Sequence, residues 1–143
     1  MPQPNTTTSF NTAKSLAKKY SKQTWKSQWA QSDTGRTLYK FQTDPNPRDA
    51  INQLERKHQC NVFRLRTGHC LLNGHRSRLN PQVQPNCRFC GHQNETVEHH
   101  LLHCERLKEI RQDLLPENPS ISTCLFGSRD QLIKTSQYHS LAL

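Results

Sequence analysis

The clearest pattern of apolar and polar positions predicts an amphipathic helix that follows Asn46 and Pro47. Apolar side chains and one histidine recur at steps of three or four residues, at Ile51, Leu54, His58, Val62 and Leu65. This spacing places them on one face of a helix. Proline suits the first helical position, and Gly68 is well placed as the residue just past the helix end. The polar side of this helix is strongly basic.

Two more helices follow from the same analysis. The stretch from about Asn11 to about Gln31 lacks proline and glycine, and its lysines recur every four residues, which predicts a basic helix. Trp25 and Trp29 project near the lysines, so either the helix breaks and buries them in a core, or aromatic and basic side chains share a face. A further helix is predicted from about Val97 to Leu115, capped by Thr96. No alternation long enough for a strand is present.

The composition indicates a small hydrophobic core and an uneven distribution of charge along the chain. Only 31% of the residues are hydrophobic and the mean hydropathy is -0.95, so another stabilising element such as a metal is expected. Residues 1–80 carry 14 basic and 4 acidic side chains, a net +10, whereas residues 81–143 carry 6 and 7, a net -1. This concentration of positive charge in one half predicts RNA or DNA as a partner. The alternative is a solvated basic surface that binds no ligand. The candidates for phosphate contacts are Arg56, Lys57, Arg64, Arg66, Arg76 and Arg78, with Lys14, Lys18, Lys22 and Lys26 as a second set.

The sequence also indicates where in the cell the protein resides and whether its cysteines are reduced. No apolar segment follows Met1, and no stretch approaches the roughly 18 apolar residues that span a bilayer. We expect an intracellular protein, nuclear or cytoplasmic, that is not secreted, has no membrane association and takes no small-molecule substrate. In a reducing compartment the six cysteines are expected to be thiols or metal ligands.

The most informative segment is residues 87–104, which read CRFCGHQNETVEHHLLHC. Two cysteines separated by two residues can direct both sulfurs at one Zn²⁺ from a tight turn, and Gly91 suits the strained position after the second cysteine. Cys104 and a histidine from the following helix would complete four ligands. A Cys87–Cys90 disulfide, a redox pair and a set of unliganded surface histidines are the alternatives; zinc is favoured because all these features occur within 18 residues.

Spacing alone does not decide which histidine binds. His100 and Cys104 are four residues apart and share a helix face, whereas His99 and Cys104 are five apart and separated by about 140° on an ideal helix. Helical geometry therefore favours His100. His99 stays open because the first turn after a cap has flexible dihedral angles. Cys60, Cys70 and Cys124 lack such spacing and are expected to be free or buried thiols.

These elements predict a mainly α fold, a small helical domain with a CCHC zinc knuckle between helices and a disordered N-terminus. The predicted organisation is a disordered tail at 1–11, a basic helical region at 12–80, a zinc-binding module at 81–116 and a C-terminal tail at 117–143. A short helix at residues 130–139 is one interpretation of that tail. Four protein ligands would leave no open position on the metal, so the zinc is expected to be structural.

Three segments together resemble a known family. They are RLRTGHCLLNGH at 64–75, CRFCG at 87–91 and ETVEHHLLHC at 95–104. They resemble the C-terminal zinc-binding region of reverse transcriptase polyproteins from non-LTR retrotransposons, especially Jockey-like elements. The resemblance extends over about residues 14–115 and includes the tryptophans and the segment GRTLY at 35–39.

The resemblance implies a ligand set and a context. The family pattern of Glu-His, four residues and Cys matches Glu98, His99 and Cys104, which implies Cys87, Cys90, His99 and Cys104 as zinc ligands. Glu105 stands where family members often have proline, so the path of the chain after the last zinc ligand is expected to differ from that of the family. The parent protein would be an RNA-directed DNA polymerase, but the five aspartates here are isolated from one another, whereas polymerase and ribonuclease H sites need clustered carboxylates.

The sequence therefore predicts a non-enzymatic, zinc-binding nucleic-acid-binding module that resembles a detached C-terminal fragment of a reverse transcriptase. A zinc-stabilised protein-interaction module and a non-functional transposon relic are the alternatives. An enzyme with a histidine-rich centre at His92, His100 and His103 is a weaker hypothesis, because no general-base carboxylate is clearly placed.

Overall fold

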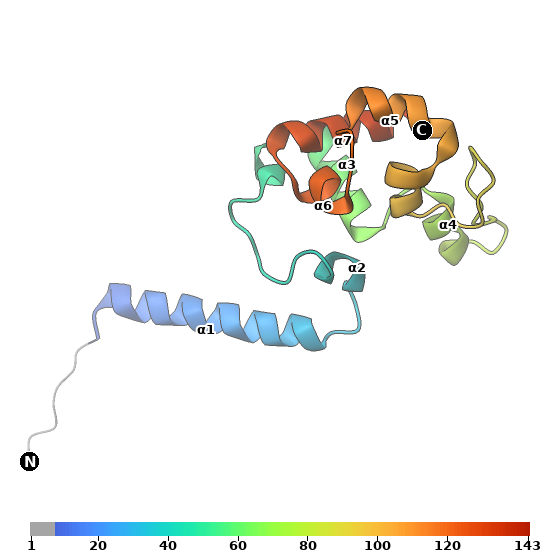
Figure 1. Ribbon diagram of the computed structural model, residues 1–143. Helices are drawn as coiled ribbons and strands as arrows, with labels where there is room; N and C mark the ends of the chain where they lie inside the picture. Colours follow the sequence, from blue (N-terminus) through green and yellow to red (C-terminus); the bar gives the residue numbers. More distant parts are fainter. Residues whose placement is uncertain (1–7) are drawn as a thin grey trace, which may run out of the picture. The chain divides into compact units, whose positions relative to one another are not determined.

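The computed structural model describes residues 8–143, which fall into two compact units, residues 8–45 and residues 46–143 (Figure 1). Every regular element in the described residues is a helix, so the predicted mainly α fold is confirmed. None of the helices within residues 8–143 is long and apolar enough to cross a membrane.

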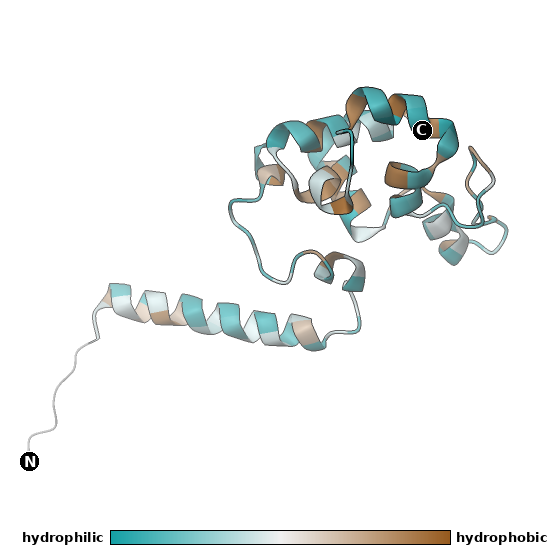
Figure 2. Cartoon of the chain, in the orientation of Figure 1, coloured by the Kyte–Doolittle hydropathy of each residue, from teal (hydrophilic) through white to brown (hydrophobic). Residues whose placement is uncertain are grey.

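The first unit contains a long helix, α1 (Phe10–Gln31), and one helical turn, α2 (Arg36–Tyr39). Ser9 caps α1 by accepting a hydrogen bond from the backbone N–H of Thr12 at 3.3 Å. The expected disordered tail at 1–11 lies largely outside the described residues. No side chain of α1 is buried, and Figure 2 shows the helix mostly in hydrophilic and neutral colours. Its sequence is too polar to form a core of its own.

The tryptophans lie on an unbroken α1, so the interpretation that a helix break precedes them is wrong. The Trp25 and Trp29 rings are 4.4 Å apart, and Trp29 also meets the Tyr39 ring at 5.7 Å. The guanidinium of Arg36 lies 4.3 Å from the Tyr39 ring centre and donates a hydrogen bond to the carbonyl of Trp29. The aromatic side chains therefore hold the turn of α2 against the end of α1.

The second unit is a helical domain arranged around its last helix. Its elements are η1 (Ala50–Gln53), α3 (Arg56–Thr67), α4 (Asn73–Leu79), η2 (His99–His103), η3 (Glu105–Leu107), α5 (Lys108–Leu114), α6 (Ile121–Phe126) and α7 (Arg129–Leu141). Helix α7 packs on α3, α5, α6 and η1. It contributes the fully buried Tyr138 and Leu132 to the two apolar clusters of this unit.

The observed boundaries differ from the predicted ones. The unit begins at Asn46, inside the region predicted as 12–80. The short helix considered at 130–139 is present as α7, but it and α6 belong to the core of the unit rather than to a tail. The helix predicted after Pro47 is split, because Leu54 is extended between η1 and α3. Asp49 caps η1 by accepting from the N–H of Ile51. Gly68 ends α3 with φ 75°, as predicted.

Arg66 is a structural residue, and the prediction that it contacts phosphate is wrong. Its guanidinium forms two hydrogen bonds to Asp49 at 2.6 and 2.9 Å, and its Nε donates to the carbonyl of Leu125 at 2.6 Å. It also lies 4.3 Å from the centre of the Phe126 ring. The side chains of Arg66 and Asp49 are only 3% and 12% exposed. This pair joins η1, α3 and α6, so a ligand has no access to the guanidinium.

We expect Arg66→Met to lower the free energy of unfolding by about 3 kcal/mol, because it leaves the mostly buried carboxylate of Asp49 without its partner. Urea denaturation of the zinc-loaded protein measures this value. The matched control is Arg64→Met, since Arg64 lies two residues earlier on the same helix and is exposed. Equal stability of the two variants would contradict the structural role of Arg66.

Candidate metal centre

The candidate metal centre begins with a tight turn over residues 87–92. The N–H of Gly91 donates to the carbonyl of Cys87 at 2.9 Å, and the N–H of Cys87 donates to the carbonyl of His92 at 2.8 Å. Gly91 has φ 76°, the left-handed conformation predicted for it. The turn therefore folds the two cysteines of the Cys-x2-Cys motif onto the same side.

The other two ligands come from a helical turn of unusual type. Thr96 caps this turn, because its Oγ1 accepts from the N–H of His99 at 3.0 Å. Residues His99–His103 then form η2, a π-helix, and the N–H of Cys104 donates to the carbonyl of His99 at 2.8 Å. This hydrogen bond joins residues that are five apart, whereas those of an α-helix join residues that are four apart. This wider turn brings His99 and Cys104 to the same side, which an α-helix does not.

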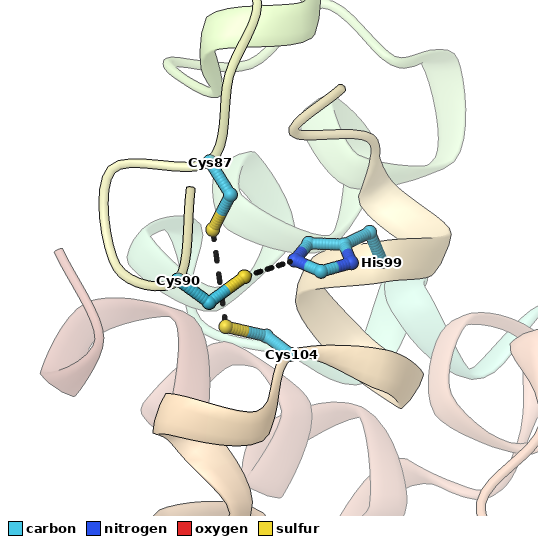
Figure 3. Close-up of side chains that lie close together, drawn as sticks. All are labelled: Cys87, Cys90, His99 and Cys104. Carbon is cyan, nitrogen blue, oxygen red and sulfur yellow. Dashed lines mark hydrogen bonds between the residues drawn. The ribbon is translucent and has the colours of Figure 1, made fainter. Parts of the chain in front are cut away.

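The structure brings Cys87, Cys90, His99 and Cys104 together, and their ligand atoms all lie within 4.8 Å of one another (Figure 3). The Cys87 and Cys104 sulfurs are 3.8 Å apart, and the Cys90 sulfur is 3.3 Å from His99 Nε2. Tetrahedral zinc, with Zn–S near 2.3 Å and Zn–N near 2.0 Å, requires separations of about 3.8 Å between sulfurs and about 3.6 Å between sulfur and nitrogen. The donor set therefore fits one zinc ion.

The protonation of the site also suits a metal. Burial lowers the pKa of His99, and the neighbouring His92 and His103 lower it further, so the imidazole stays neutral, the form that binds zinc. Burial raises the pKa of the Cys104 thiol to about 11. Burial also opposes ionisation of Cys90, but the backbone N–H of His92 and the neighbouring thiols outweigh it and lower the pKa of that thiol. Zinc binding would deprotonate the thiols together.

His100 is not part of this cluster. Its ring is buried and its Nε2 lies 3.2 Å from His139 Nδ1, on α7. Burial lowers the pKa of His100 to about 3 and that of His139 to about 4, so both rings are neutral. Helical geometry favoured His100 as ligand, and this expectation is wrong because the turn is not α-helical. His100 contributes to the core instead.

The helix predicted from Val97 to Leu115 is interrupted at the site. The chain is extended at Cys104 and continues through η3 into α5. Backbone carbonyls freed by this interruption accept side-chain hydrogen bonds. Arg111 donates from Nε to the carbonyl of Leu101 at 2.9 Å and from Nη2 to the carbonyl of Cys104 at 2.7 Å. The hydroxyl of Tyr138 donates to the carbonyl of His100 at 2.6 Å. Arg111 and Tyr138 therefore position the ligand turn, although no sequence pattern marked them.

A buried carboxylate anchors the cysteine turn to α4. Glu95 is fully buried and accepts hydrogen bonds from the Arg88 guanidinium and from the N–H of Asn73 at 2.6 Å. Arg88 in turn donates to the carbonyl of Leu71 at 2.5 Å. A Cβ at Gly74 would lie 2.7 Å from the Glu95 carbonyl oxygen, so this close approach requires glycine. Glu95 was missed because an isolated glutamate in a polar segment gives no signal of burial.

The remaining cysteines lie outside the site. Cys60, Cys70 and Cys124 are free, and the latter two are buried, as predicted for thiols without ligand spacing. Burial raises the pKa of Cys70, and it raises that of Cys124 to about 11. Cys70 and Cys124 therefore remain protonated at neutral pH.

This arrangement defines a structural zinc-binding module, because three sulfurs and one imidazole fill the four positions of a tetrahedral metal. Residues 50–110 match the family described as zinc-binding in reverse transcriptase. The match supports a reverse transcriptase-associated zinc-binding region in this part of the chain, in agreement with the resemblance at this level, and the matched residues include all four candidate ligands. No curated protein and no solved structure matches the chain.

We expect one zinc ion per chain in the purified protein and less than about 0.1 in Cys87→Ser, because a hydroxyl is a poor zinc ligand. Elemental analysis after removal of loosely bound metal measures this ratio. His99→Gln should also lose zinc, whereas His100→Gln should retain it. Zinc loss confined to the His100 variant would contradict the assigned ligand set.

We expect Arg111→Met to lower the free energy of unfolding by about 2 kcal/mol, because two carbonyls at the ligand turn lose charged donors. Thermal or urea unfolding with excess zinc measures the change. Arg106→Met is the control, since Arg106 is exposed in η3 and its loss should be nearly neutral. A destabilisation as large in the control would contradict the proposed role of Arg111.

Proposed function

We propose that this chain is a zinc-stabilised module that binds RNA or DNA, in the context of a reverse transcriptase. The observation that carries the proposal is a set of exposed basic side chains on α3 and α4, none of which is a candidate zinc ligand. They are Arg56, Lys57, Arg64, Arg76 and Arg78. The family match supports the reverse transcriptase context, since the matched region is named for it.

Helical geometry supports a common binding face on α3. At 100° per residue, Arg56, Lys57 and Arg64 project within about 100° of one another. The buried Val62 and Leu65 project to the opposite side. The exposed side of α3 thus concentrates positive charge in a way that suits phosphate groups.

The lysines of α1 form a second, weaker set. Lys14, Lys18 and Lys22 are exposed, whereas Lys26 forms an ion pair with Asp44 at 2.7 Å. Exposed ion pairs contribute little to stability, so a phosphate can replace Asp44 at small cost. We therefore retain all four lysines as candidate contacts.

The proposed role is non-enzymatic. The zinc ligands form a closed set of four protein groups, which leaves no position for a water that the metal would activate. The matched family describes a zinc-binding region and not a polymerase domain. Polymerisation in such a system would be performed by catalytic carboxylates outside the matched region.

The second candidate function is protein interaction, and the exposed apolar side chains of α1 favour it. Phe10, Leu16 and Tyr20 are 80%, 58% and 72% exposed. Apolar groups gathered on one element often mark a docking surface. A partner bound there would be lost on Leu16→Asp and retained when the arginines of α3 and α4 are changed.

We expect the affinity for a labelled RNA or DNA strand to fall steeply with salt, with a slope of about 0.7 to 0.9 per neutralised phosphate. The double variant Arg64→Glu with Arg76→Glu should weaken binding at least tenfold and reduce the slope by about 1.5. Fluorescence anisotropy between 50 and 200 mM salt, about the range over which counterion release is measurable, gives both values. Arg106→Glu is the control for one charge reversal outside α3 and α4, since each Arg→Glu substitution lowers the net charge by two units.

Undetectable or salt-insensitive binding to single-stranded RNA, duplex DNA and hybrid alike would contradict the proposal. Retention of zinc by the double variant shows that a loss of affinity comes from the charge and not from unfolding.

A further inference from the structure

A groove outside the zinc site combines positive charge with exposed apolar side chains. It has a volume of about 250 Å³ and lies between the end of α3, the loop that follows it and α4. Arg64, His69, Leu71, His75, Arg76 and Leu79 line it, and no carboxylate does. Such a lining is attractive to an anion that also carries an apolar group.

The apolar part of the lining faces solvent. Leu71 and Leu79 are 61% and 74% exposed. A single exposed leucine is ordinary on a protein surface, but here two border one groove beside two guanidinium groups. They form an apolar surface against which a flat ligand group can be buried.

The two histidines add an aromatic surface. The His69 and His75 rings are 5.0 Å apart, with 66° between their planes. Burial lowers the pKa of His75, and the nearby His69 and Arg78 lower it further. At neutral pH His75 therefore offers a neutral ring rather than a charge. Histidine rings and guanidinium planes are among the groups on which unstacked bases pack.

We propose that this groove binds one unpaired nucleotide of an RNA or single-stranded DNA, with its base against Leu71, Leu79 and the histidine rings and its flanking phosphates on Arg64 and Arg76. This inference rests on the proposed function and specifies the form of its ligand. A paired base is stacked between its neighbours and cannot enter a groove of this size, whereas an unpaired base exposes both faces. An acidic peptide would satisfy the arginines but offers no flat ring for the histidines.

The test uses the full chain loaded with zinc and two fluorescein-labelled probes, a single strand without self-complementarity and a hairpin duplex with the same number of phosphates. The variant is Leu71→Ser with Leu79→Ser, and Leu79→Gln alone is a milder second variant. Leu141→Ser is the matched control, because Leu141 is 69% exposed on α7 and does not line the groove.

We expect the wild type to prefer the single strand, and the double leucine variant to bind it at least about fivefold more weakly, as for the loss of base stacking. Its affinity for the duplex and its salt slope should stay unchanged, because leucine neutralises no phosphate. Leu79→Gln should show a smaller loss in the same direction, and Leu141→Ser should show none.

Three outcomes would overturn the inference while leaving nucleic-acid binding intact: equal affinity for the two probes, no loss in either leucine variant, or equal losses on both probes. Displacement of the single strand by a leucine-containing acidic peptide at lower concentration than by unlabelled strand would also overturn it, in favour of a protein ligand. Absence of binding to either probe by the wild type would instead refute the proposed function itself.

Discussion

The second unit depends on one geometric constraint, that His99 and Cys104 reach the same metal although they are five residues apart. A π-turn satisfies this constraint, but it ends at an extended Cys104 and leaves backbone carbonyls without helical partners. Arg111 and Tyr138 supply the missing donors. The metal site, α5 and the central helix α7 are thereby linked by hydrogen bonds, and the small apolar core packs around them.

The elements that could be predicted from sequence are those with strong local signals. The polar, lysine-rich α1, the glycine that ends α3 and the Cys-x2-Cys turn with Gly91 all depend on neighbouring residues alone. The helix at 130–139 was one interpretation of the sequence and is present as α7, but its place in the core depends on partners distant in sequence. The same is true of the break of the helix at Cys104, of the core helix α6 and of the burial of Glu95. Helical periodicity favoured His100 as the ligand, because it assumes an ideal α-helix. The family pattern identified His99 instead, because the spacing between the motif residues already reflects the π-turn at this position.

The basic residues of α3 illustrate why charge in a sequence does not reveal its use. Arg64 and Arg66 are separated by one residue, yet they project about 160° apart on the helix. Arg64 faces the solvent and borders the groove, whereas Arg66 is enclosed by Asp49, Leu125 and Phe126. The first serves recognition in our proposal, and the second holds η1 and α6 to α3. The distinction comes from the fold and is invisible in composition.

The central position of α7 also bears on how the protein is made. The four zinc ligands leave the ribosome before residues 129–141, whose side chains complete both apolar clusters. During synthesis the metal can therefore bind an immature chain, while the groups that support its ligand turn arrive later. Zinc would then act as an early nucleus that limits the conformations available to the nascent chain, and the final helix would lock that arrangement in place.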